Sequence, residues 1–161
     1  MKLTTKGRYA VSALADIAAT GAATGSDGPV ALSDVALRQG ISLSYLEQLF
    51  AKLRRAGLVE SVRGVAGGYA LTAPASETRV ADIIAAVDEE IRTTACATGS
   101  AIGCQGTSAR CLTHDLWDEL GRQIEVFLNA VTLEDIIERR VAGMAAVNAP
   151  IRENSFAGAA E

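Results

Sequence analysis

Apolar residues in the first part of the chain recur at steps of three and four, which is the spacing of an amphipathic helix. A first helix is predicted from about Lys6, with Thr4 or Thr5 as its N-cap. Its inner face is formed by five apolar positions: Ala10, Ala13, Leu14, Ile17 and Ala18. Residues 21–29 are rich in Gly, Ala, Ser and Asp, a composition typical of a turn, so we expect the helix to end there.

Two further helices are predicted on either side of a short turn that contains glycine. Ser33 is expected to cap the first of them, which Gly40 ends. The second is expected to begin at Ser42 or Ser44 and to stop at Gly57. One of its faces is apolar, with Leu46, Leu49, Phe50 and Leu53. This pattern is typical of a helix-turn-helix, whose second helix enters a DNA groove.

An extended pattern follows the second of these helices directly. Residues 58–62 and 69–71 alternate apolar or branched side chains with polar ones, and residues 63–68 between them are rich in glycine. The pattern predicts a β-hairpin, and a hairpin directly after a helix-turn-helix is the winged-helix arrangement. Arg63 would then lie near the tip of the wing.

The next part of the chain is less regular. Residues 74–78 are typical of a linker, and a short amphipathic helix is predicted after them. Its apolar positions are Val80, Ile83, Ile84 and Val87. From 93 to 110 the chain has almost no large side chain, too few to hold a fixed shape by its own packing. Something other than its own packing must therefore order this stretch, or it stays mobile.

A longer helix is predicted from near Leu112, with a charged face opposite an apolar stripe. The stripe consists of Leu116, Leu120, Ile124, Phe127 or Leu128, and Val131. The stripe could pack on the first domain, but the equivalent helix of a second copy is the better candidate, and we therefore expect a homodimer. Thr132 with Asp135 is expected to cap a final short helix that runs through Arg140.

Together these patterns predict a mainly α fold with a small β-hairpin wing. A winged helix-turn-helix DNA-binding region is expected at residues 1–73. Residues 74–142 would hold a linker helix, a loop at 93–114 and a dimerisation helix, and residues 143–161 a flexible tail.

The formal charge of −4 is unevenly distributed along the chain. Residues 1–72 carry eight Lys or Arg and five Asp or Glu, a charge of +3, whereas residues 73–161 carry seven and fourteen, a charge of −7. We therefore expect only the first half to meet a polyanion. No stretch approaches the roughly 18 to 20 apolar residues that a membrane helix needs. With no secretory signal visible either, the expected location is the cytoplasm.

Cys96, Cys104, Cys111 and His114 are all the cysteines and the only histidine of the chain, and they fall within nineteen residues. Thiolates and imidazole are ligands of zinc and of iron–sulfur clusters, so we expect a metal site in the 93–114 loop. The Cys-x-x-Cys pair usual in structural zinc sites is missing. Zinc, thiols that only fill gaps, and a Cys–His nucleophilic pair of an enzyme stay open as alternatives. The nucleophilic pair lacks a third, orienting group.

Polar residues gather at the start of the predicted recognition helix, the end that reaches base edges. They are Ser42, Ser44, Tyr45, Glu47 and Gln48. Gln pairs with adenine and Glu accepts from cytosine, although Ser44 and Glu47 also have the spacing of a capping box. Lys52, Arg54 and Arg55 farther along would meet phosphates or form a solvated face.

Several stretches between Met1 and about Arg140 carry a family pattern: MKLTTKGRYA at 1–10, QGISLSYLEQLF at 39–50, CLTH at 111–114 and FLNAVT at 127–132. On these residues the chain resembles the IscR family of bacterial iron–sulfur cluster regulators. The chain departs from the family in two places. Its gaps of seven and six residues between the cysteines are a little longer than in the best-known members, and Val65-Ala66 replaces the Pro-Gly often seen in the wing.

The resemblance implies a homodimeric transcription factor that holds a 2Fe-2S cluster, received from the iron–sulfur assembly machinery, and that adjusts genes for cluster assembly. The implied ligands are Cys96, Cys104, Cys111 and His114. Because imidazole can be protonated near neutral pH and leave, such a cluster is more labile than one held by four cysteines, as suits a sensor. The resemblance also implies that Glu47 disfavours one class of operator when the cluster is absent.

The nitric-oxide-sensing NsrR regulators of the same superfamily are a second possibility. They also use three cysteines in a comparable loop, but they typically carry an acidic residue near position 8, where this chain has Arg8.

Overall fold

The computed structural model describes residues 5–24, 28–64, 66–88, 93 and 112–141. These residues form six helices and two strands. In chain order they are α1 (Thr5–Thr24), α2 (Leu32–Gln39), α3 (Leu43–Arg55), β1 (Val59–Val62), β2 (Gly68–Leu71), α4 (Val80–Ala86), α5 (His114–Ala130) and α6 (Leu133–Ile137). The predicted mainly helical fold with one hairpin is confirmed, whereas the predicted tail at 143–161 lies outside the described residues.

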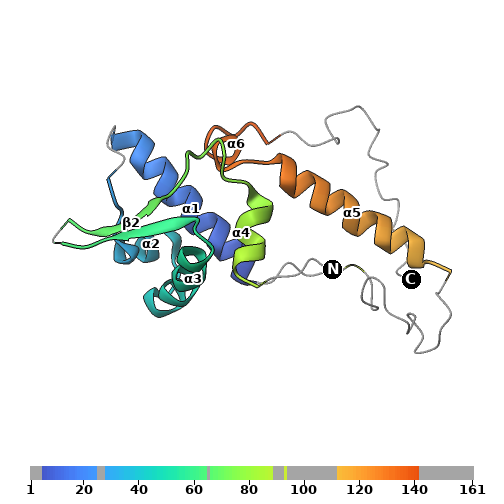
Figure 1. The fold of residues 1–161 in the computed structure, drawn as a ribbon, viewed down its shortest axis with the longest axis horizontal. Coiled ribbons are helices and arrows are strands. Elements are labelled where there is room, and N and C mark those ends of the chain that lie inside the picture. The colour runs from blue at the N-terminus through green and yellow to red at the C-terminus, as the bar shows by residue number, and fades with distance from the viewer. Residues whose placement is uncertain (1–4, 25–27, 65, 89–92, 94–111, 142–161) are drawn as a thin grey trace, which may run out of the picture.

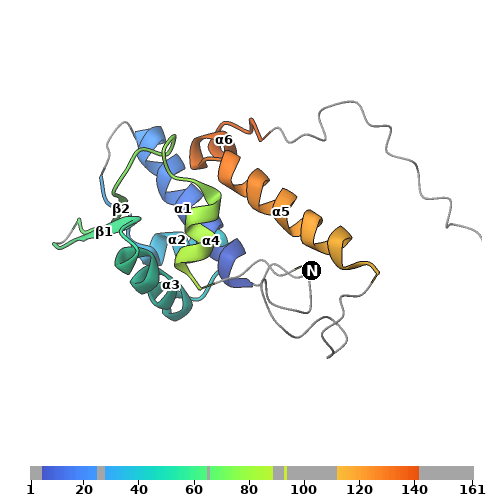
Figure 2. The ribbon, with the colours of Figure 1, turned by 45° about the vertical axis from the view of Figure 1, so that its right-hand side comes forward.

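The helices fall into a compact group and one projecting helix (Figures 1 and 2). α1 to α4 and the hairpin gather on one side. α5 meets this group at its C-terminal end, and the rest of the helix extends away from it. α6 contacts α1 and lies where α5 joins the group. The first part of the chain therefore forms one packed body, to which α5 is attached at its C-terminal end.

The core of this body is enclosed by α1, α2, α3, α4, the hairpin and α6. The predicted inner faces of α1 and α3 are buried, with Phe50, Leu14, Leu46 and Leu53 fully enclosed. The Phe50 ring meets the Tyr69 ring of the hairpin edge-on, with 4.9 Å between centroids. Truncating a buried Phe to Ala typically costs about 3 to 5 kcal/mol, so this contact helps to hold the hairpin against α3.

The boundaries of α1 and α2 differ from the predicted ones. α1 continues through residues 21–24, which we expected in a turn, because alanine-rich sequence favours a helix enough to tolerate one glycine. The predicted cap at Ser33 is wrong: Ala31 is the N-cap of α2, without a side-chain hydrogen bond. Val30 is held extended by two backbone hydrogen bonds with Tyr69, so the helix begins directly after Ala31.

The first turn of α3 decides between the two predicted caps. The Ser42 side chain accepts a hydrogen bond from the Tyr45 backbone N–H, so Ser42 is the N-cap. Ser44 lies inside the helix, and its predicted capping box with Glu47 is wrong. Both of these side chains are therefore exposed without a capping role.

The hairpin pairs in antiparallel register from Val59 opposite Leu71 to Val62 opposite Gly68. Gly68 lies so close to Val30 that a Cβ on it would overlap the Val30 carbonyl group. The wing is thereby joined to the chain segment before α2.

α5 is held to the packed body by contacts at its C-terminal end. The Val80 backbone N–H donates to the Val131 carbonyl at 3.0 Å, and Arg79 Nη1 donates to the Asn129 carbonyl at 3.0 Å. Val80 and Val131 are also buried together in a small apolar cluster. The start of α5, at His114, therefore lies far from α3 and the hairpin (Figure 1).

α6 carries the predicted capping box between Thr132 and Asp135. Hydrogen bonds from the backbone and hydroxyl of Thr132 lower the pKa of the Asp135 carboxyl. The helix ends at Ile137 rather than at the predicted Arg140, because the chain turns at Arg139 with a left-handed φ of 55°.

Gly68→Ala is expected to lower the free energy of unfolding by about 1 to 3 kcal/mol, because the added Cβ forces the hairpin away from Val30. Urea denaturation measures this change. Glu60→Ala, at an exposed position of β1, is the control and should stay within about 0.5 kcal/mol of the wild type. Equal unfolding midpoints for Gly68→Ala and the wild type would show that the close approach of Gly68 to Val30 does not contribute to stability.

Candidate nucleic-acid interface and metal centre

The start of α3 presents a polar surface. Ser42, Ser44, Glu47 and Gln48 are all exposed, because the opposite face of the helix is buried in the core. Tyr45 is half-buried, and its ring meets the Tyr9 ring of α1 edge-on with 5.9 Å between centroids. The predicted base-reading residues are therefore brought to one end of one helix.

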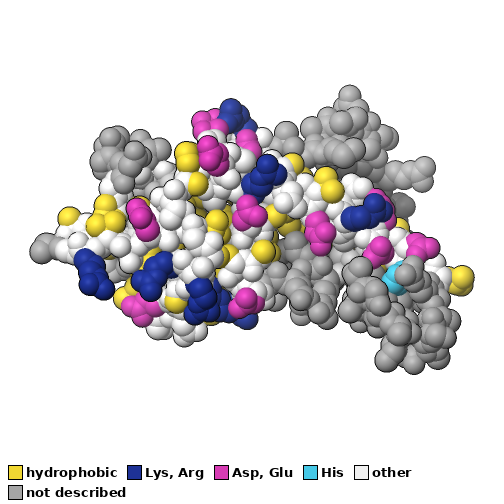
Figure 3. Space-filling view, in the orientation of Figure 1, with side chains coloured by type: hydrophobic (Ala, Val, Ile, Leu, Met, Phe, Trp, Pro, Cys, Tyr) yellow, Lys and Arg dark blue, Asp and Glu magenta, His cyan; other side chains and the backbone are white. Residues whose placement is uncertain are grey.

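Basic side chains lie next to this surface. Figure 3 shows several Lys and Arg side chains along one edge of the molecule, over the hairpin and α3, with a few acidic side chains among them, and charges of both signs over α5 and α6. Arg54 Nη1 lies 3.4 Å from the Ser61 hydroxyl, which links α3 to β1. Arg55 and Arg63 are exposed. A cationic edge beside a polar helix start suits the phosphates that flank a base-contacting helix.

Lys52 differs from the other basic residues of α3. Its Nζ is 2.7 Å from Oδ2 of Asp88, which directly follows Val87 at the end of α4. The hydrogen bond and the charge of Lys52, with smaller contributions from Lys6 and Arg55, lower the pKa of Asp88. Asp88 is the first of three consecutive acidic residues, and nothing in that run indicates a partner thirty-six positions earlier in the chain.

Of the four predicted metal ligands, the structure describes only His114. It is the first residue of α5 and only 8% exposed, and so is shielded from water. Cys96, Cys104 and Cys111 lie outside the described residues. Within the described part of the chain, no three His, Cys, Asp or Glu side chains are grouped closely enough to hold a metal ion.

Both described ends of the predicted 93–114 loop lie on α5. Thr93 packs against Gly121, where an added Cβ would press on the Thr93 hydroxyl, and His114 begins the helix. Gly121 is buried by this approach although it lies in the middle of an otherwise exposed helix. The segment that contains the cysteines therefore begins and ends on one helix.

Several large apolar side chains of α5 are partly exposed. Leu116 is 62% exposed, and Leu120 and Phe127 are 38% and 39% exposed. Only Val131, at the end of the predicted stripe, is buried against the packed body. Most of the stripe is thus available to a partner.

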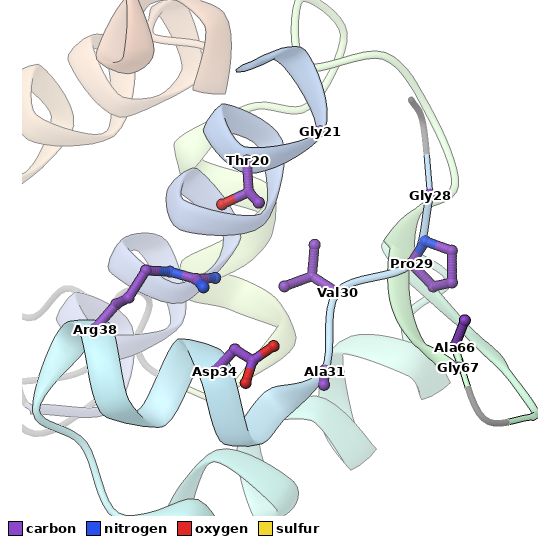
Figure 4. A pocket seen from close by; sticks show the side chains of 10 residues that line it. All are labelled: Thr20, Gly21, Gly28, Pro29, Val30, Ala31, Asp34, Arg38, Ala66 and Gly67. Carbon is purple, nitrogen blue, oxygen red and sulfur yellow. The ribbon is translucent and has the colours of Figure 1, made fainter. Parts of the chain in front are cut away.

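A pocket of about 350 Å³ lies between the end of α1, the start of α2 and the hairpin turn (Figure 4). Arg38 and Asp34 are the charged side chains that line it. Arg38 is already engaged, because its guanidinium donates three hydrogen bonds to the two carboxylate oxygens of Asp16. We therefore assign no ligand to this pocket.

None of the helices formed by the described residues is both long enough and apolar enough to cross a membrane.

Comparison with known proteins identifies similar regulators. The chain matches the Rrf2 family, described as an iron-dependent transcriptional regulator, over residues 3–139. The IscR regulator of Vibrio atlanticus is 55% identical over 138 residues, which are 86% of this chain and 76% of that protein. The IscR regulator of Photorhabdus laumondii is 51% identical over 140 residues, 87% of this chain and 81% of that protein.

Two solved structures share the fold. The IscR of T. potens superposes with a TM-score of 0.67 at 37% identity and covers 87% of this chain and 88% of its own. CymR, the global cysteine regulator of B. subtilis, has a TM-score of 0.70 at 29% identity over 86% of this chain and 98% of its own.

Proposed function

Since the chain belongs to the Rrf2 family of iron-dependent transcriptional regulators and is of the IscR type, we propose that it senses iron–sulfur clusters. In this role it binds two-fold symmetric DNA operators and controls genes for cluster assembly, in the cytoplasm and with no catalytic activity. The position of His114 supports this most directly, since a buried imidazole three residues after Cys111 can share one metal site with it.

On the DNA side, the start of α3 enters the major groove. Gln48 and Glu47 contact base edges there, with Ser42, Ser44 and Tyr45 around them. Arg54, Arg55 and Arg63 lie beside them and neutralise phosphates. The hydrogen bond from Arg54 to Ser61 supports this assignment, because it holds one of these cations between the helix and the wing.

On the metal side, Cys96, Cys104, Cys111 and His114 would hold a 2Fe-2S cluster, supplied by the iron–sulfur assembly machinery. The donor set fits, since three thiolates and one neutral imidazole make the centre less negative than four thiolates would and raise its potential. Thr93 and His114, by lying on α5, keep both ends of the loop near one place.

The absorption spectrum and the iron and sulfide content of anaerobically purified protein test the function. We expect a coloured protein with iron and sulfide in equal amounts. A colourless protein with bound zinc would instead establish the zinc-stabilised alternative, and release of the cluster by nitric oxide at physiological levels would favour the NsrR-type alternative.

Replacement of any of Cys96, Cys104 or Cys111 by Ala is expected to abolish iron and sulfide binding, because each removes a thiolate ligand. His114→Cys should keep the cluster or hold it more firmly, since a thiolate replaces a ligand that can be protonated. Iron and sulfide analysis beside circular dichroism separates ligand loss from misfolding. Full occupancy in Cys96→Ala would remove that residue from the ligand set.

The exposed stripe of α5 supports a homodimer in which two copies pair their long helices. Leu120→Asp is expected to weaken association by several kcal/mol, because it places an unpaired charge in an apolar seam. Val126→Asp is the matched control, since Val126 is 60% exposed on the same helix but lies off the stripe. The measurement is sedimentation at micromolar concentration. A wild-type protein that sediments as a monomer would contradict the dimer.

Glu47 is proposed to select between operators according to cluster status. A carboxylate that faces acceptor groups on the bases is repelled, at about 1 to 3 kcal/mol per mismatched contact. Glu47→Ala should therefore let the cluster-free protein bind operators that otherwise require the cluster. Titration of apo and holo protein against both operator classes at one salt concentration measures this. Equal weakening of every complex would mean that Glu47 does not select operators.

A further inference from the structure

The ion pair between Lys52 and Asp88 joins the recognition helix to the end of α4. Lys52 Nζ and Asp88 Oδ2 are 2.7 Å apart, and the two side chains are 32% and 76% exposed. Arg55 and Arg63, two other basic residues of the cationic edge, form no ion pair with any carboxylate in the described part of the chain. Among the basic residues predicted to contact phosphates, Lys52 is therefore the one whose positive charge is paired with a carboxylate of the same chain.

The backbone on both sides places these two groups together. Lys52 lies between Leu49 and Leu53, whose burial in the core fixes the rotation of α3. Asp88 follows Val87, which is fully buried, and has a left-handed φ of 55°. Asp adopts this conformation more readily than most residues. The contact thus results from two anchored pieces of backbone rather than from two freely moving side chains.

Asp88 also lies among more cations than the one it binds. The charges of Lys6 on α1 and Arg55 on α3 add to that of Lys52 in lowering its pKa, so the carboxylate stays ionised. This single acid consequently offsets positive charge at the junction of three helices, on the side of α3 that would approach DNA phosphates.

We propose that Asp88 is a positioning residue of the DNA interface, which withholds Lys52 from phosphates as long as the ion pair is intact. The inference rests on the proposed binding of DNA. Exposed ion pairs are weak and screened by salt, so a carboxylate at this position limits the affinity for DNA without preventing binding.

The salt dependence of DNA binding tests the role of Asp88. Each phosphate that a protein neutralises contributes about 0.9 to the slope of log affinity against log salt. Asp88→Asn should therefore steepen the slope by about 0.9. The ratio of its affinity for DNA to that of the wild type should fall about 3.5-fold between 50 and 200 mM salt. Asn keeps the size of the side chain and tolerates the left-handed backbone, so the fold is preserved.

The experiment uses the full-length protein and a mixed-sequence DNA duplex long enough for two half-sites, with binding followed by fluorescence anisotropy. Lys52→Met keeps the apolar stem and removes the charge. When it is combined with Asp88→Asn, it should cancel the gain in affinity and remove the added steepness of the slope. Asp82→Asn, in the first turn of α4, removes an equal charge at the other end of the helix that Asp88 follows and should leave the slope unchanged.

Two results would overturn the inference while leaving DNA binding established. The first is an identical slope for the wild type and Asp88→Asn. The second is a steeper slope that persists when Lys52→Met is added, because the carboxylate would then act by general repulsion of DNA. If the wild type bound no duplex at any salt concentration, the proposed function would fail and this inference with it.

Discussion

The burial of one face of α3 in the shared core governs the other features of this protein. Phe50, Leu46 and Leu53 have no exposed surface, and Phe50 also holds the hairpin through Tyr69. A helix buried on one side along its whole length cannot rotate without exposing these side chains to water. The residues on its opposite side are therefore held at the surface in one fixed orientation, beside the wing, which a DNA-contacting helix requires.

The attachment of α5 at one end separates two surfaces that have different chemistry. Val131 and Asn129 join its C-terminal end to α4 and the preceding loop through backbone and side-chain hydrogen bonds. The remainder projects with its apolar side chains exposed, and both described ends of the cysteine-containing loop lie on it. One helix thus carries the proposed dimer surface and the proposed metal centre, at a distance from the proposed DNA-contacting edge (Figure 2).

The places where helices begin show the limit of prediction from sequence. Ser33 has a suitable capping side chain, yet α2 begins earlier because Val30 pairs with Tyr69 across the hairpin. The cap of α3 is one of the two serines that the sequence offers, and the choice falls on Ser42 because the helix starts directly after it. Local capping preferences are worth about 1 kcal/mol, so a single long-range backbone contact can override them.

The sequence by itself determined the succession of helices and hairpin and the polar face of α3, because residues at helical spacing have one common way to be buried. It also brings the cysteines and His114 together in one stretch, although the assignment of the cysteines as ligands stays a prediction. Only the tertiary structure decided that Lys52 pairs with Asp88 and that Thr93 meets Gly121. Such partners are selected by how helices pack in space, and the spacing of two residues along the chain does not predict that they will meet.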